Sequence, residues 1–147
     1  VRDMGRTAAG VRGVRLRADD YVIGAAIIRE GDEVLVITEN GYGKRTLGSA
    51  YPIKGRGGKG IKTANITEKN GPLAGLTTVS GKEDILLITD KGIMIRFHAA
   101  SVSQTGRATL GVRLIKMEDD AKVITMATVE SEPEVVVEVE ENPIVEE

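Results

Sequence analysis

Arginine and lysine side chains recur beside glycines in three copies of one short motif. The motif is Gly-Arg-x-x-x-Gly, at residues 5–10, 55–60 and 106–111. Glycine lets the backbone approach a ligand closely, and Arg and Lys neutralise phosphate groups through charge and hydrogen bonds. The motif and the basic residues that follow it therefore form a candidate polyanion site. Its candidate contacts are Arg6, Arg12, Arg15, Arg56, Lys59, Lys62, Arg107 and Arg113.

Two further candidates, Lys44 and Arg45, follow a predicted hairpin turn, and Arg96 stands at the place of Arg45 one repeat later. Two interpretations are open for these residues. They extend the basic surface, or they form ion pairs with acidic neighbours such as Glu39 and Asp90.

Other kinds of chemistry have weaker support in the sequence. Residues 55–60 formally fit the dinucleotide-binding pattern, but that pattern needs a helix after it, and residues 61–66 are predicted to form a strand. Lys59 is followed by Gly60 rather than Ser or Thr, which excludes a P-loop. The chain has one His and no Cys, so a zinc site or a thiol nucleophile is not expected. We therefore predict no catalytic residue, no metal and no cofactor in this chain.

Charge is distributed unevenly along the chain. Residues 1–117 carry 19 Lys and Arg against 11 Asp and Glu, whereas residues 118–147 carry 1 against 11. Such asymmetry favours a polyanion partner for the basic part and an acidic tail after it. We expect residues 130–147 to be a disordered acidic tail, and an added strand at residues 135–140 is the alternative.

Two independent sequence ladders show an internal repeat. Residues 33–41 recur as residues 84–92, a shift of 51, and the Gly-Arg motif recurs at shifts of 50 and 51. Within the repeat, alternating β-branched residues precede Asn40-Gly41, which is typical of a type I′ hairpin turn. Strands are predicted at residues 10–16, 21–29, 34–38, 42–46, 60–66, 73–79, 84–89, 93–97, 111–117 and 122–129.

This pattern gives four strands per repeat and about two and a half repeats. Four short strands in about 50 residues are typical of a propeller blade, so an all-β, propeller-like body is predicted over residues 1–129. Equivalent residues of stacked blades share one rim, so the basic residues are expected to form a track. No apolar run approaches the ~18 residues of a membrane span.

The motifs at residues 4–16, 38–46 and 106–114 resemble the C-terminal domain of the DNA gyrase A protein, and the resemblance extends to about residue 129. The absence of Trp and the 3% aromatic content disfavour WD40 and kelch repeats. The resemblance implies a β-pinwheel, a propeller-like disc with double-stranded DNA wrapped around its basic rim. It also implies that the domain supports ATP-dependent negative supercoiling by the holoenzyme without being catalytic itself.

The same resemblance implies a setting for the chain. Its partners would be DNA, the B subunit of gyrase and the rest of the gyrase A protein in an A2B2 assembly, in the bacterial cytoplasm and nucleoid. ATP and magnesium would be used elsewhere in that assembly. Residues 54–60 match the last five positions of the family's Gln-Arg-Arg-Gly-Gly-Lys-Gly box, with Lys54 and Gly55 replacing its first two, as in a degenerate copy on a late blade. The open alternatives are the corresponding domain of topoisomerase IV and a propeller scaffold that binds proteins.

Overall fold

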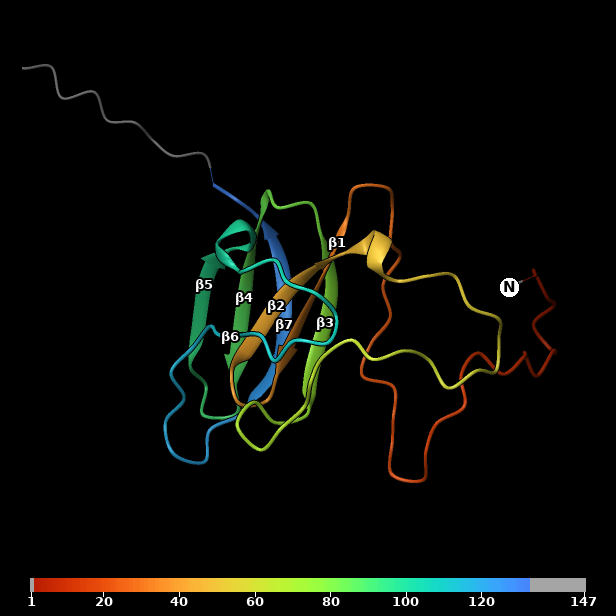
Figure 1. Cartoon of the computed structure of the whole chain (residues 1–147), viewed down its shortest axis with the longest axis horizontal. Helices are drawn as coiled ribbons and strands as arrows, with labels where there is room; N and C mark the ends of the chain where they lie inside the picture. The colour runs from red at the N-terminus through yellow and green to blue at the C-terminus, as the bar shows by residue number, and fades with distance from the viewer. Residues whose placement is uncertain (1, 133–147) are drawn as a thin grey trace, which may run out of the picture.

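The computed structural model describes residues 2–132, and this part of the chain is built from strands and loops (Figure 1). Two short 3-10 turns, η1 (Gly48–Ala50) and η2 (Ala99–Ser101), accompany the strands. The predicted all-β class is confirmed. The strands are β1 (Glu33–Thr38), β2 (Tyr42–Leu47), β3 (Leu73–Val79), β4 (Glu83–Thr89), β5 (Met94–His98), β6 (Val112–Arg113) and β7 (Val123–Glu130).

The strands form two antiparallel sheets that repeat one design. The first sheet has the order β3-β1-β2-β6 and the second has the order β5-β4-β7. In each, a hairpin (β1–β2 or β4–β5) receives a later strand (β3 or β7) along the edge of its first strand. A register shift between Ile37 and Thr38 recurs between Ile88 and Thr89, 51 residues later. The sequence repeat is therefore also a structural repeat.

Each sheet takes its strands from more than one repeat, which corrects the prediction of four consecutive strands per blade. β3 belongs to the repeat after the β1–β2 hairpin, and β6 belongs to the repeat after that. Residues 21–29 correspond to β3 at a shift of 50, but residues 2–132 contain no hairpin one repeat before them. The same holds for residues 10–16 and 60–66, which correspond to β6. Because backbone groups without a partner strand remain solvated, none of these three segments forms a strand.

The core lies between the two sheets and joins them. Its central side chains, which are at most 2% exposed, come from β1, β3, β4 and β7, and from η2 and the residue after it. In Figure 1 the second sheet (β5, β4 and β7) stands beside β1, β2 and β3, while residues 2–30 and 51–60 extend to the other side. The core residues are Leu35, Ile37, Val79, Ile85, Leu87, Ala99, Val102 and Val123.

The predicted hairpin is confirmed, but its turn is not the predicted type I′, which needs a positive φ at both central residues. The Gly41 amide donates to the Thr38 carbonyl at 3.0 Å, and within residues 39–41 only Gly41 has a positive φ. Gly41 has φ 81°, a left-handed conformation that favours glycine. The Thr38 hydroxyl accepts a hydrogen bond from the Tyr42 amide at 3.2 Å. Thr89 and the Ile93 amide repeat this bond at 3.2 Å. Each hairpin is thus fixed by its own short sequence.

The last glycine of the Gly-Arg motif has a backbone role in all three copies. Gly10, Gly60 and Gly111 have φ values of 82°, 78° and 88°. A Cβ atom on Gly111 would lie 2.8 Å from the Gly43 carbonyl oxygen, whereas a Cβ atom on Gly60 would have nothing within 4 Å. Only the third copy is packed closely against a sheet.

This difference gives a matched pair of variants. Gly60→Ala should cost about 1 kcal/mol of unfolding free energy, the cost of a left-handed residue with a side chain. Gly111→Ala should cost roughly 2–4 kcal/mol, because its Cβ also collides with β2. Urea melts of the two variants measure the difference. Equal losses would show that the third loop is not packed as described.

The described chain ends close to the second sheet. β7 ends at Glu130, one residue beyond the expected boundary at 129. Ser131 donates a hydrogen bond to Asp84 at 2.6 Å, and Glu132 pairs with Arg96 at 3.3 Å. Residues 133–147, which include most of the expected acidic tail and its alternative strand, lie outside the described residues. In residues 2–132, no helix is long and apolar enough to cross a membrane.

Candidate nucleic-acid interface

The three Gly-Arg motifs fold in the same way, as a turn with arginine at its second position. We call them the first loop (residues 5–10), the second loop (55–60) and the third loop (106–111). The turn is closed by Ala8 N–H to the Gly5 carbonyl at 3.1 Å in the first loop, and by Thr109 N–H to the Gly106 carbonyl at 3.4 Å in the third. In the second loop the turn lies at Arg56. Each arginine is therefore presented at the tip of a turn.

Successive loops are also connected by backbone hydrogen bonds. The Arg15 amide, just after the first loop, donates to Gly58 of the second loop at 2.7 Å. Fifty residues later the Asn65 amide, just after the second loop, donates to Thr109 of the third loop at 3.0 Å. In Figure 1 the loops follow one another from the N-terminal end toward the first sheet. The repeat thus sets the loops side by side in chain order.

Eight of the ten predicted contact residues are accessible. Seven are exposed and Arg107 is half-buried. The Arg107 guanidinium donates to the Lys62 carbonyl at 2.9 Å. This bond holds the third loop against the segment that follows the second loop. The exposed residues are Arg6, Arg12, Arg15, Arg56, Lys59, Lys62 and Arg113.

Lys44 is not part of this surface, which corrects its inclusion among the candidates. The residue is 1% exposed, and its ammonium donates to the carbonyls of Gly106, Arg107 and Thr109 at 2.8, 2.6 and 3.1 Å. The Thr109 hydroxyl is also within 3.2 Å. Burial, and then the charge of Arg107, lower the pKa of Lys44 below its usual value. The side chain supports the third loop from inside.

Arg45 is also directed inward, so the ion-pair interpretation holds, although with a different partner. Its guanidinium lies 2.8 Å from the Glu33 carboxylate and donates to the Val102 carbonyl at 2.7 Å. Glu33 is opposite Leu47 in the hairpin, so Arg45 lies diagonally across on the same face. Glu39 pairs instead with Lys122 at 3.3 Å. Arg96 repeats the arrangement with Asp84 at 2.7 Å.

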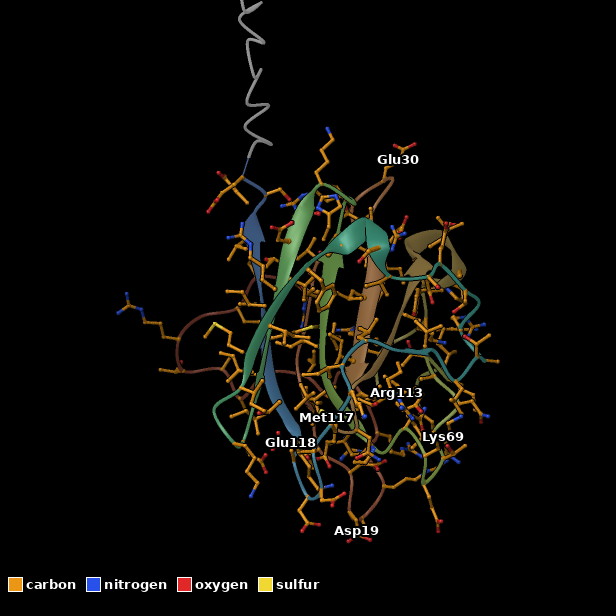
Figure 2. All side chains as sticks on the ribbon, turned by 90° about the vertical axis from the view of Figure 1, so that its left-hand side faces the viewer. Asp19, Glu30, Lys69, Arg113, Met117 and Glu118 are labelled. Carbon is orange, nitrogen blue, oxygen red and sulfur yellow. The ribbon has the colours of Figure 1, made fainter. Side chains whose placement is uncertain are left out.

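Sequence reasoning named Arg113 but missed that it meets Lys69 and Tyr42 at the hairpin-turn end of the first sheet. The Arg113 guanidinium stacks 5.6 Å from the Tyr42 ring centre and donates to its hydroxyl at 3.1 Å, and the Lys69 ammonium lies 5.8 Å from the same ring. With Lys116 they line a depression of about 580 Å³, whose wall also carries the acidic residues 118–120. Figure 2 shows Arg113 between Lys69 on one side and Glu118 on the other. Because these residues are up to 71 positions apart, only their charge could have indicated them.

Asp84, His98 and Ser131 meet near the end of the second sheet but do not form a catalytic triad. In a triad the serine contacts one ring nitrogen and the carboxylate contacts the other. Here Asp84 and Ser131 both contact His98 Nδ1, at 2.9 and 3.1 Å. Hydrogen bonds from Ser131, His98 and Arg96 hold the pKa of Asp84 well below its usual value. The group fastens residues 131–132 to β4 and β5.

A hairpin repeat completed by strands from later repeats, with one basic loop per repeat, defines a propeller-type β-repeat domain. A family profile described as "DNA gyrase C-terminal domain, beta-propeller" matches residues 1–29, 32–80 and 83–130. Each matched segment contains one of the three loops. Because the match covers most of the chain, the chain belongs to this family.

Known relatives and solved structures agree with this assignment. The chain is 52% identical over 136 residues to the DNA gyrase A protein of Staphylococcus aureus, an alignment that covers 91% of this chain and 15% of the relative. A solved DNA gyrase A C-terminal domain superposes with a TM-score of 0.63 at 26% identity, over 65% of this chain and 33% of that one. The C-terminal domain of DNA topoisomerase IV superposes with a TM-score of 0.77 at 22% identity, over 83% and 38%. The second likeness shows the fold alone, so gyrase is the better supported of the two relationships.

Proposed function

We propose that this chain is a DNA-binding module of a gyrase-type topoisomerase that holds duplex DNA by its phosphate backbone. The observation that supports this best is the row of three connected loops, each with an arginine at the tip of a turn. Arginines at regular intervals match a ligand with regularly spaced negative charges. Each contact releases counterions, so the energy comes from charge rather than from base identity.

Backbone contact is favoured over base reading by where the basic residues lie. Base reading in the major groove uses an inserted helix or a two-stranded ribbon. The accessible candidates lie in loops or in the two-residue strand β6. Binding should therefore be nearly independent of sequence. Lys69 and Lys116 add two cations beside Arg113 for the same ligand, and the acidic residues 118–120 line the other part of that depression.

The role in the whole protein is an extension of this proposal. The chain spans about 15% of the length of the Staphylococcus aureus relatives that it matches. In a protein of that kind, the module would wrap DNA so that strand passage introduces negative supercoils, together with the B subunit of gyrase and the rest of the gyrase A protein. The module would be non-catalytic and without a cofactor, and ATP and magnesium would act elsewhere in a bacterial cytoplasmic enzyme. A scaffold for protein partners is the competing function.

A salt titration tests DNA binding directly. Eight phosphate contacts predict a slope of about −7 for log K against log salt, and a loss of roughly 10⁴-fold between 50 and 200 mM. Two duplexes of about 30 bp and unrelated sequence should give the same slope and similar affinities, measured by fluorescence anisotropy. A flat salt dependence, or no binding at low salt, would favour the protein scaffold instead.

A further inference from the structure

The Lys44 side chain is placed beneath the third loop in a way that the proposed DNA binding does not require. It leaves β2 and reaches a turn more than 60 residues later, where its ammonium donates to three carbonyls of residues 106–109. Three carbonyl acceptors match the three protons of a charged ammonium. No carboxylate lies within ion-pair distance of Lys44 among residues 2–132. A buried positive charge is therefore left without a counter-charge in this part of the chain.

The second sheet shows that this lysine is not needed to build the hairpin. Lys44 lies opposite Val36 in the first hairpin, and Ile95 lies opposite Leu87 at the equivalent place in the second. Ile95 packs on the core as an apolar residue. Burying an ammonium is costly. An apolar residue is therefore expected at this position when no loop carbonyls lie within reach of the side chain. The lysine occurs in the hairpin that carries the third loop.

The backbone of the third loop is arranged for an anion. Its carbonyls at 106, 107 and 109 accept from Lys44. In the turn from Gly106 to Thr109, the amides of Arg107 and Ala108 have no acceptor among the described residues. Successive free amides in a turn form a concavity that binds anions. The Arg107 side chain stands beside them, held by the Lys62 carbonyl.

We propose that Lys44 is a positioning residue that shapes the third loop into a preformed seat for one phosphate group and charges that seat from beneath. The Arg107 and Ala108 amides and the Arg107 guanidinium contact the phosphate, and Lys44 acts through the loop. Because Lys44 is buried, its attraction for an anion is screened less than that of a surface charge. This inference rests on the proposed DNA binding, since it names a contact point for the same ligand. Lys44 is the one buried lysine among residues 2–132, so within this part of the chain no buried lysine lies beneath the second loop.

The variant Lys44→Met removes the charge and keeps most of the volume, and Ile95→Met is the matched control in the second hairpin. For Lys44→Met we expect the salt slope on a duplex of about 30 bp to fall by about one and the affinity at about 0.1 M salt to fall about tenfold. Ile95→Met should leave both unchanged. Adding Arg107→Ala to Lys44→Met should cost less than the sum of the single changes, because both act on one seat. A Lys44→Met variant with unchanged slope and affinity would overturn the inference.

A second measurement works if Lys44→Met does not fold. Nitrogen-15 NMR spectra of the unaltered chain during a titration with inorganic phosphate should show saturable shifts of the Arg107 and Ala108 amides. The amides of Arg6 and Thr7 in the first loop, which also have no acceptor among the described residues, should shift much less. Equal shifts in both loops, or none in the third, would overturn the seat. If the unaltered chain bound no duplex but these shifts appeared, the proposed DNA function would fail while the anion seat remained.

Discussion

Replacing Arg6, Arg56 and Arg107 together with alanine is expected to weaken duplex binding about 500-fold at about 0.1 M salt. Each arginine stands at the tip of its loop, and each lost phosphate contact lowers the salt slope by about 0.9. Three losses lower the slope by about 2.7. Between about 1 M and about 0.1 M salt, that difference in slope corresponds to a roughly 500-fold difference in affinity. The effect should disappear as salt approaches about 1 M. Anisotropy titrations on one duplex of about 30 bp at several salt concentrations measure it.

A second triple variant controls for net charge. Arg29, Lys82 and Lys91 are exposed and lie outside the three loops, and their replacement with alanine removes the same three charges. Charges that do not touch DNA are screened beyond about 10 Å at 0.1 M salt, so this variant should lose no more than a few-fold in affinity. Equal losses in the two triple variants would mean that overall charge, and not the row of loops, determines binding.

The hairpins could be predicted from sequence because their signals are local. The alternating run at residues 34–38 is followed at once by Asn40-Gly41, and residues 84–92 repeat the pattern. Turn geometry fixes which strand pairs with which, so β1, β2, β4 and β5 follow from short windows. The sequence pattern also places β3 and β7 within one residue of their bounds.

The partners of the remaining strands could not be predicted, because they come from later repeats. Residues 21–29 and 73–79 have similar apolar patterns, yet only the second segment is a strand. Residues 73–79 pair with β1, whereas residues 2–132 contain no hairpin one repeat before residues 21–29. Strand propensity describes how well a segment fits a sheet, but it does not say which strand will pair with that segment.

The sequence predicts the interface residues that the repeat places at the surface. It fails for residues whose exposure depends on tertiary packing. Arginines that recur in a turn motif lie at or near the surface in every copy. Lys44 and Arg45 are adjacent and alike in charge. However, the third loop covers Lys44, and Glu33 forms an ion pair with Arg45. Both partners are fixed by the tertiary structure, and composition carries no sign of either. The meeting of Tyr42 with Arg113 is equally non-local.

The core substitution Ile85→Ala is expected to remove about 2–5 kcal/mol of unfolding free energy. Ile85 is fully buried in the cluster that joins the two sheets, and a small domain has only about 5–15 kcal/mol in total. Ile53→Ala is the matched control, because Ile53 is fully exposed and its loss should change stability by less than about 0.5 kcal/mol. Urea melts of the two variants measure the difference.

Because the cluster contains residues of both sheets, Ile85→Ala should weaken them together. Hydrogen exchange should show amides of β1 and β4 losing protection in parallel, although only β4 carries the substitution. Val102, in the same cluster, begins the segment that leads to the third loop, and its carbonyl accepts from Arg45. Loosening the core should therefore also loosen the third loop and lower duplex affinity, most clearly near the melting temperature. Exchange that rises in β4 while β1 keeps its protection would mean that the two sheets fold as independent units.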